Sequence, residues 1–250
     1  MPRFFIRQNQ IADGTVRLVG EDAHHAARSL RMAVGDEITV CDMQGNEYTC
    51  TITEFEEDRA VMATIVSARA SDKELPCFVT VYQALPKGDK LDTVIQKAVE
   101  CGASRIVPFE SERCVARVKP EAEARKTERR QRIAEEAAKQ CGRSVLPEVT
   151  PTVRFSEMLA MASGDDVGLF CYEGDGTSPM GEILREKREA LSGARVAVVV
   201  GSEGGFSLHE AQAARDAGLL PVGLGKRILR TETASGFALS CLVYVTELGG

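Results

Sequence analysis

The most informative stretch of the 250-residue chain is ARVAVVVGSEGGFSLHE, residues 194–210. Its uninterrupted apolar run, 196–200, is typical of a strand buried on both faces of a parallel sheet. Gly204 and Gly205 follow at once, and glycines allow the backbone to turn tightly and a ligand to approach it closely. Ser207 and Glu210 have the spacing of a capping box, so a helix is predicted to begin there. The stretch therefore predicts a strand, a glycine loop and a helix in succession.

The same alternation extends along most of the chain. Apolar strands are predicted at 77–85, 104–109, 166–172, 194–201 and 219–225. Helical patterns occupy 89–102, 120–142, 180–191, 207–218 and 231–248. Because the strands are apolar throughout, we expect an α/β domain, residues 76–250, with a parallel sheet covered by helices on both faces.

The first 70 residues have a different texture. Alternating segments rich in Thr, Val and Ile lie at 3–6, 37–42, 47–55 and 60–68. MQGN (43–46) and EEDR (56–59) are predicted turns between them, and one helix is expected near 21–32. This pattern predicts a small β-barrel over residues 1–70, followed by a polar linker that ends in Pro76.

Composition limits the function. The net charge of −6 gives no global sign of nucleic-acid binding, so any basic site must be local. None of the eight Cys forms a C-x-x-C pair, and the three His are too few and too scattered for a His-rich metal site, so no metal is expected. Residues 1–10 lack the apolar core of a signal peptide, and no apolar run approaches a membrane span. We therefore expect a cytoplasmic protein with reduced thiols and no membrane partner.

Two loops are candidate ligand sites, because ligands of parallel sheets bind beyond the C-terminal ends of strands. One is 201–207, and the other is 224–230, which also follows an apolar strand. The second loop carries Lys226, Arg227 and Arg230 around apolar Ile228 and Leu229, which indicates that part of it faces inward. Neither a G-x-G-x-x-G nor a P-loop motif is present. A tight turn and a solvated basic loop therefore stay open as the alternative.

A family resemblance favours the ligand site. GSEGGFS (201–207) followed by LGKRILRTETA (224–234) resembles the paired signatures of the RsmE family of 16S ribosomal RNA uracil-3 methyltransferases, in the SPOUT superfamily. Further segments resemble other family signatures in the expected order: PRFFI (2–6), HHAARSLRMAVGDEI (24–38), KGDKLDTVIQKAVECGASRIVPFESERC (87–114) and RIAEEAAKQCGRSVLPEV (132–149). The chain departs from the family at Ser202, where proline is usual, and at Cys101 and Cys141, where Leu and Ser are more frequent.

The resemblance implies a PUA-like N-terminal barrel, a C-terminal domain with a trefoil knot, a homodimer, and S-adenosylmethionine as methyl donor. The knot and the donor site are expected roughly within 165–250. The implied donor-binding residues are Leu169, Phe170, Tyr172, Glu173, Gly201, Ser202, Glu203, Gly204, Gly205, Leu224, Gly225, Arg227, Ile228, Leu229 and Thr233.

Catalysis would be a direct displacement in which the imide nitrogen of a uracil attacks the methyl group. Arg230 follows the donor loop, and its guanidinium can stabilise the negative charge that develops on the uracil carbonyl oxygens. Glu232 is expected to accept a proton or to orient Arg230. The equal alternative is a first-turn carboxylate that the helix dipole favours.

RNA would be bound by locally basic surfaces, as a 16S ribosomal RNA or small-subunit substrate requires. Residues 113–143 carry a net charge of +5, although ion pairs within the predicted helix account for much of it. The expected RNA contacts are Arg3, Arg7, Arg28, Arg31, Lys87, Arg113 and Arg143. Two other functions stay open: a knotted methyltransferase acting on tRNA or on a ribose hydroxyl, and a non-catalytic RNA-binding assembly protein.

Overall fold

The computed structural model describes residues 1–56 and 60–249, and the chain divides into two compact units. The N-terminal unit comprises residues 1–74 together with 138–146, and the C-terminal unit comprises the remainder. The division after Glu74 falls inside the polar segment 68–76. Residues 138–146 return to the N-terminal unit from the far end of a long helix, which no local sequence pattern indicates.

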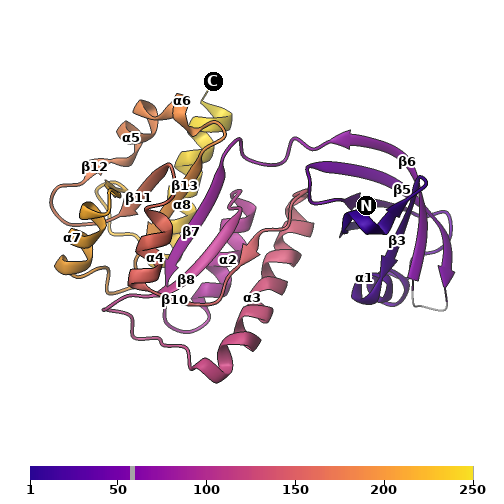
Figure 1. Cartoon of the computed structure of the whole chain (residues 1–250), viewed down its shortest axis with the longest axis horizontal. Helices are drawn as coiled ribbons and strands as arrows, with labels where there is room; N and C mark the ends of the chain where they lie inside the picture. Colours follow the sequence, from indigo (N-terminus) through magenta and orange to yellow (C-terminus); the bar gives the residue numbers. More distant parts are fainter. Residues whose placement is uncertain (57–59, 250) are drawn as a thin grey trace. The chain divides into compact units, whose positions relative to one another are not determined.

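The N-terminal unit is built on a six-stranded mixed sheet in the order β1-β4-β5-β6-β3-β2 (Figure 1). Its strands are β1 (Arg3–Phe5), β2 (Ile11–Ala12), β3 (Thr15–Val19), β4 (Glu37–Cys41), β5 (Asn46–Glu56) and β6 (Ala60–Ala70). The predicted helix is present as α1 (Gly20–His24), which continues as η2 (His25–Ser29). Alternate strand residues such as Phe4, Ile38 and Ile52 are buried in its core, as the period of a half-buried sheet requires.

The turn predicted at residues 43–46 is present in this unit. The MQGN segment joins β4 to β5, with the Asp42 carboxylate accepting hydrogen bonds from the backbone N–H groups of Gln44 (2.8 Å) and Asn46 (3.1 Å). The predicted turn at 56–59 extends into residues 57–59, outside the described residues. The strands β2 and β3 were not predicted.

Buried charges tie residues 138–146 into the N-terminal unit. The Glu74 carboxylate accepts hydrogen bonds from the Arg143 guanidinium and from the backbone N–H groups of Ser144 (3.0 Å) and Val145 (3.2 Å). Arg3 donates to Glu47 at 2.7 Å and to the carbonyl oxygen of Arg143 at 3.2 Å. Only 3% of Arg143 is exposed. Because their guanidinium groups are engaged inside the unit, we assign Arg3 and Arg143 a structural role in place of the expected RNA contacts.

We expect Glu74→Ala to lower the free energy of unfolding by about 3 kcal/mol, because it removes the carboxylate that accepts from the buried Arg143 guanidinium and from the backbone N–H groups of Ser144 and Val145. Denaturant unfolding followed by circular dichroism measures the loss, and Glu54→Ala, which removes an exposed carboxylate from β5, is the control. Burial alone would raise the pKa of Glu74, but its hydrogen bonds to Arg143 and to backbone N–H groups hold it below the ordinary 4.5. The stabilisation is therefore present above pH 4.5 and is lost as the pH falls through the lower pKa of the folded state. An unfolding free energy equal to that of the wild type would contradict this role.

The C-terminal unit contains the predicted parallel sheet, in the order β10-β8-β7-β13-β11-β14-β12, with β9 paired to β8 (Figure 1). The strands are β7 (Phe78–Ala84), β8 (Arg105–Glu110), β9 (Glu148–Val149), β10 (Val153–Arg154), β11 (Val167–Cys171), β12 (Ser178–Pro179), β13 (Arg195–Val200) and β14 (Leu220–Gly223). Every pairing in this sheet that the structure describes is parallel, which confirms the α/β class. The central β13 is buried from Val196 to Val200.

Helices cover this sheet on both faces. They are α2 (Lys90–Glu100), α3 (Pro120–Cys141), α4 (Phe155–Ala162), α5 (Met180–Glu186), α6 (Arg188–Leu191), α7 (Leu208–Asp216) and α8 (Thr231–Val243), which continues as η3 (Tyr244–Leu248). α2 and α8 pack against each other, and α8 also contacts β13. The crossover from β7 through α2 to β8 moves along the sheet toward β10, whereas the crossovers through α4 and α7 move toward β12. Because such crossovers are right-handed, α4 and α7 lie on the face opposite to α2 and α8. The trefoil knot stays a prediction.

Candidate active site

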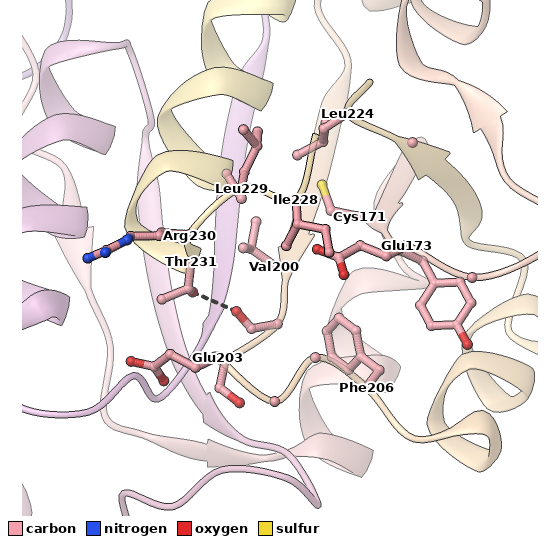
Figure 2. A pocket seen from close by; sticks show the side chains of 18 of the residues that line it. Cys171, Glu173, Val200, Glu203, Phe206, Leu224, Ile228, Leu229, Arg230 and Thr231 are labelled. Atoms are coloured by element: carbon pink, nitrogen blue, oxygen red, sulfur yellow. Dashed lines mark hydrogen bonds between the residues drawn. The ribbon is translucent and has the colours of Figure 1, made fainter. Parts of the chain in front are cut away.

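Three loops enclose a cavity of about 760 Å³ at the C-terminal edge of the parallel sheet (Figure 2). They follow β11, β13 and β14, and these strands are neighbours because β11 lies between the other two. The cavity is lined by residues 171–174 from the first loop, 200–206 from the second and 223–231 from the third, and also by Lys90, Arg113, Thr177 and Ala234. The structure thus brings together loops that are about 25 residues apart in sequence.

The loop after β13 is held in shape by the helix that follows it. The Ser207 hydroxyl accepts a hydrogen bond from the Glu210 backbone N–H (3.2 Å), and the Glu210 carboxylate accepts one from the Ser207 N–H (3.0 Å). The predicted capping box is confirmed. The other oxygen of Glu210, a residue only 4% exposed, accepts a hydrogen bond from the backbone N–H of Glu112 (2.8 Å). This carboxylate therefore also fixes the segment that carries Arg113.

The loop after β14 is anchored where α8 begins. The Thr231 hydroxyl donates to the carbonyl oxygen of Gly201 at 2.6 Å (dashed in Figure 2). It accepts a hydrogen bond at 2.9 Å from the side chain of Gln83, which is fully buried at the end of β7. These bonds join the first turn of α8 to the ends of β7 and β13.

The deeper wall of the cavity is apolar, with a few polar atoms. Val200, Phe206, Leu224 and Leu229 line it, and their side chains surround the same hollow in Figure 2. The Ser202 hydroxyl oxygen is buried there and has no hydrogen-bond partner within the described residues.

Glycines keep part of this space open. Gly205 (φ +61°) and Gly225 (φ +104°) both line the cavity, and a Cβ added at either would meet no atom within 4 Å. Gly204 differs, because a Cβ there would lie 3.0 Å from the Cβ of Arg113. Arg113 also donates to the carbonyl oxygen of Gly204 at 3.2 Å, so its segment packs directly against the glycine loop.

Charged side chains gather at one side of the cavity. The Arg230 and Glu203 side chains extend toward this side in Figure 2, away from Phe206. Lys90 Nζ lies 2.7 Å from Glu203 Oε1 and 3.8 Å from Glu232 Oε2. The cavity thus has an apolar part suited to a ligand body and a charged part suited to a polar reaction partner.

Most of the expected donor residues line the cavity: Tyr172, Glu173, Gly201, Ser202, Glu203, Gly204, Gly205, Leu224, Gly225, Arg227, Ile228 and Leu229. Leu169 and Phe170 do not, because they are fully buried within β11. Phe170 instead supports the wall from behind, with its ring 4.4 Å from that of Phe206. Thr233 is exposed on α8 and also lies off the lining.

Of the two residues expected to act in catalysis, one lines the cavity and the other does not. Arg230 lines the cavity, whereas Glu232 does not. Lys90 and Thr231 line it and were not predicted as site residues. Lys90 has a usable sequence signal, because it follows a predicted strand and therefore lies at the ligand-binding edge of the sheet.

The remaining expected RNA contacts are on the surface. Arg7, Arg28 and Arg31 are exposed on the N-terminal unit, and Lys87 is exposed on the C-terminal unit. Arg113 is exposed and lines the cavity. Among residues 1–56 and 60–249, no group of three or more His, Cys, Asp or Glu is arranged to hold a metal ion. In the same part of the chain, no helix has both the length and the apolar character to cross a membrane.

Comparison with protein families defines the class. Residues 73–243 match the model of an RNA methyltransferase domain, and residues 18–61 match that of an RNA methyltransferase PUA domain. The chain is therefore an RNA methyltransferase of α/β fold with an N-terminal PUA domain. It is 35% identical to the ribosomal RNA small subunit methyltransferase E of Bacillus subtilis (strain 168), over 99% of this chain and 98% of the relative. The chain belongs to the ribosomal RNA small subunit methyltransferase E family, which confirms the resemblance found in the sequence.

Solved structures agree. The ribosomal RNA small subunit methyltransferase E of Neisseria gonorrhoeae, bound to S-adenosyl methionine, is 34% identical with a TM-score of 0.84, and the match covers 98% of each chain. A putative methyltransferase of Legionella pneumophila, in complex with the bound cofactor SAM, is 29% identical with a TM-score of 0.81 over 96% of each chain.

Proposed function

We propose that this protein transfers the methyl group of S-adenosylmethionine to the 3-nitrogen of a uridine in 16S ribosomal RNA of the small subunit, a step of ribosome assembly in the cytoplasm. The observation that carries the proposal is the cavity formed by three strand-end loops, with Arg230 at its charged side. The names and bound ligand of the relatives support the donor and the ribosomal substrate.

The residues of the cavity fit the donor. Apolar Val200, Leu224 and Leu229 suit the adenine ring, and the glycine backbone around Gly205 leaves room for close approach.

Arg230 is the residue that we assign to the acceptor base. Bound S-adenosylmethionine supplies a methyl group on a positively charged sulfur. The N3 atom of uracil takes part in base pairing, so the target uridine must be unpaired or flipped out of a helix. Arg230 is exposed at the N-cap of α8, where its guanidinium can donate paired hydrogen bonds to a uracil carbonyl. It thereby stabilises the charge that develops when the imide loses its proton.

Incubation with methyl-labelled donor tests the proposal. Small subunits, naked 16S ribosomal RNA and tRNA are offered separately, from cells that lack the enzyme. We expect label in 16S ribosomal RNA and none in tRNA. Label in tRNA would favour another knotted methyltransferase, and RNA binding without donor consumption would favour an assembly protein.

Arg7, Arg28 and Arg31 are proposed to bind phosphates, so their replacement should weaken RNA binding and lessen its dependence on salt.

We further propose a symmetric homodimer that uses the outer face of α8. Phe237, Tyr244 and Leu248 are 39%, 62% and 70% exposed along one face of α8 and η3, an apolar stripe that a partner would cover. We expect a dimer by light scattering at micromolar concentration and a monomer for Phe237→Asp. Leu208→Asp changes an equally apolar, exposed residue on α7 and should remain dimeric. A monomeric wild type would contradict the proposed assembly.

A further inference from the structure

Lys90 connects two parts of the candidate active site. It is the first residue of α2, and its ammonium group lies between a carboxylate of the loop after β13 and one in the first turn of α8. The Nζ atom is 2.7 Å from Glu203 and 3.8 Å from Glu232. Lys90 reaches the cavity from α2, which is not part of any of the three loops that follow β11, β13 and β14.

The pair formed by Lys90 and Glu203 is held in its charged form. The backbone N–H of Lys87 donates to Glu203 at 3.2 Å, in addition to the hydrogen bond from Lys90. Burial alone would raise the pKa of Glu203, but these hydrogen bonds outweigh it and keep the pKa below its ordinary value. The hydrogen bond to Glu203 raises the pKa of Lys90. At neutral pH, Glu203 therefore orients a cationic Lys90 at the cavity.

Glu232 does not use any of the hydrogen-bond donors of the Lys90 ammonium group. Its Oε2 atom is buried and makes no hydrogen bond within the described residues, at a distance from Lys90 that permits attraction without bonding. The ammonium group has three donors, and Glu203 accepts one of them. The charged groups that face Lys90 are Glu203, Glu232 and Arg230.

The proposed reaction offers a place for a second cation. The N3 atom of uracil is flanked by two carbonyl groups, so loss of its proton spreads negative charge over two oxygens on opposite sides of the nitrogen. One guanidinium at one oxygen leaves the other to water. Arg230 and Lys90 both line the cavity, and they come from different elements.

We propose that Lys90 is a second catalytic cation, which binds one carbonyl oxygen of the uracil while Arg230 binds the other, and that Glu203 is its positioning residue. The inference rests on the proposed function. In the step, the N3–H bond breaks and water takes the proton. The N3–carbon bond forms as the carbon–sulfur bond of the donor breaks, and the electron pair stays on sulfur. Such a site selects an imide, because cytosine has an amino group in place of one carbonyl.

Single-turnover rates with saturating donor and 16S ribosomal RNA test the inference. We expect Lys90→Met to lower the rate by about a hundredfold at neutral pH, the scale of losing one charge-stabilising donor. The deficit should shrink as the pH rises, because alkaline solution ionises the imide without the cation. Lys90→Arg should recover part of the rate, and Glu203→Gln should fall between the wild type and Lys90→Met. Lys97→Met removes an exposed lysine further along the same helix and should match the wild type.

Donor affinity, measured by calorimetry, separates this role from a structural one. We expect Lys90→Met to bind donor within a few-fold of the wild type. A wild-type rate, or a deficit equal at every pH together with lost donor binding, would overturn the role of Lys90. Nucleosides from the same reactions are analysed in parallel. A wild-type product other than 3-methyluridine would overturn the proposed function itself and the inference with it.

Discussion

Arg230→Ala is expected to bind S-adenosylmethionine within a few-fold of the wild type and to methylate RNA about a hundredfold more slowly or worse. The reason is positional. The cavity proposed for the donor is lined by residues 223–231, and Arg230 is exposed there at the start of α8, on the charged side of the cavity (Figure 2). Its loss removes charge stabilisation from the acceptor while the apolar donor wall is unchanged. Single-turnover rates at saturating donor and RNA measure the effect.

Arg230→Lys distinguishes charge from geometry. It keeps the positive charge but loses the planar fork that makes paired hydrogen bonds, so we expect partial rescue. A normal rate in Arg230→Ala would show that Arg230 takes no part in the reaction. A rate that recovers at higher RNA concentration would instead make Arg230 a binding residue.

Gly205→Val is expected to weaken donor affinity by more than about a hundredfold. The added side chain would occupy space that the donor needs, and the backbone conformation would become strained. Gly205 has a φ of +61°, it lines the cavity, and no atom lies within 4 Å of an added Cβ. A branched side chain would enter that space and disfavour the present backbone conformation. Titration calorimetry measures the affinity.

Gly218→Val is the matched control for this variant. Gly218 also has a positive φ, +86°, and no atom lies within 4 Å of an added Cβ, but it is exposed at the end of α7. We expect Gly218→Val to carry similar backbone strain and to bind donor normally. Unchanged affinity in a folded Gly205→Val protein would remove this loop from the donor site.

The parallel sheet was predictable because its strands are continuous apolar runs, and one of them, 194–201, contains the observed β13. The β3 strand TVRLV was missed, although it alternates clearly and follows a tight turn at Asp13 and Gly14. The helix α4 was missed because Arg154 occupies its N-cap instead of Ser, Thr, Asp or Asn. Two-residue strands such as β12 carry no measurable period.

Two of the three cavity loops, 201–207 and 224–230, were predictable as ligand loops from glycines at strand ends, and the third came only from the family resemblance. The direction in which individual side chains point was not predictable. The helix α8 begins at Thr231, which turns toward Gly201. Thr233, two residues later, points away because each helical residue turns the chain by about 100°. Lys90 was missed although its place after a predicted strand was a usable signal, whereas its contact with Glu203 depends on the pairing of β7 with β13.

For two of the expected RNA contacts, the sequence could not show that the side chains are engaged inside the protein. Arg3 and Arg143 are basic residues in motif-like segments, and nothing local distinguishes them from surface arginines. Their partners Glu47 and Glu74 lie 44 and 69 residues away in sequence. Burial of an arginine is decided by such distant carboxylates, which only the folded structure brings into contact.

Mass spectrometry of nucleosides tests the central claim most directly. Small subunits from cells that lack the enzyme are incubated with the protein and methyl-labelled S-adenosylmethionine, and their 16S ribosomal RNA is digested to nucleosides. We predict that the label appears as 3-methyluridine and that Arg230→Ala reduces its yield. Label in a 2′-O-methylated nucleoside or in a methylated cytidine, or no label at all, would contradict the account.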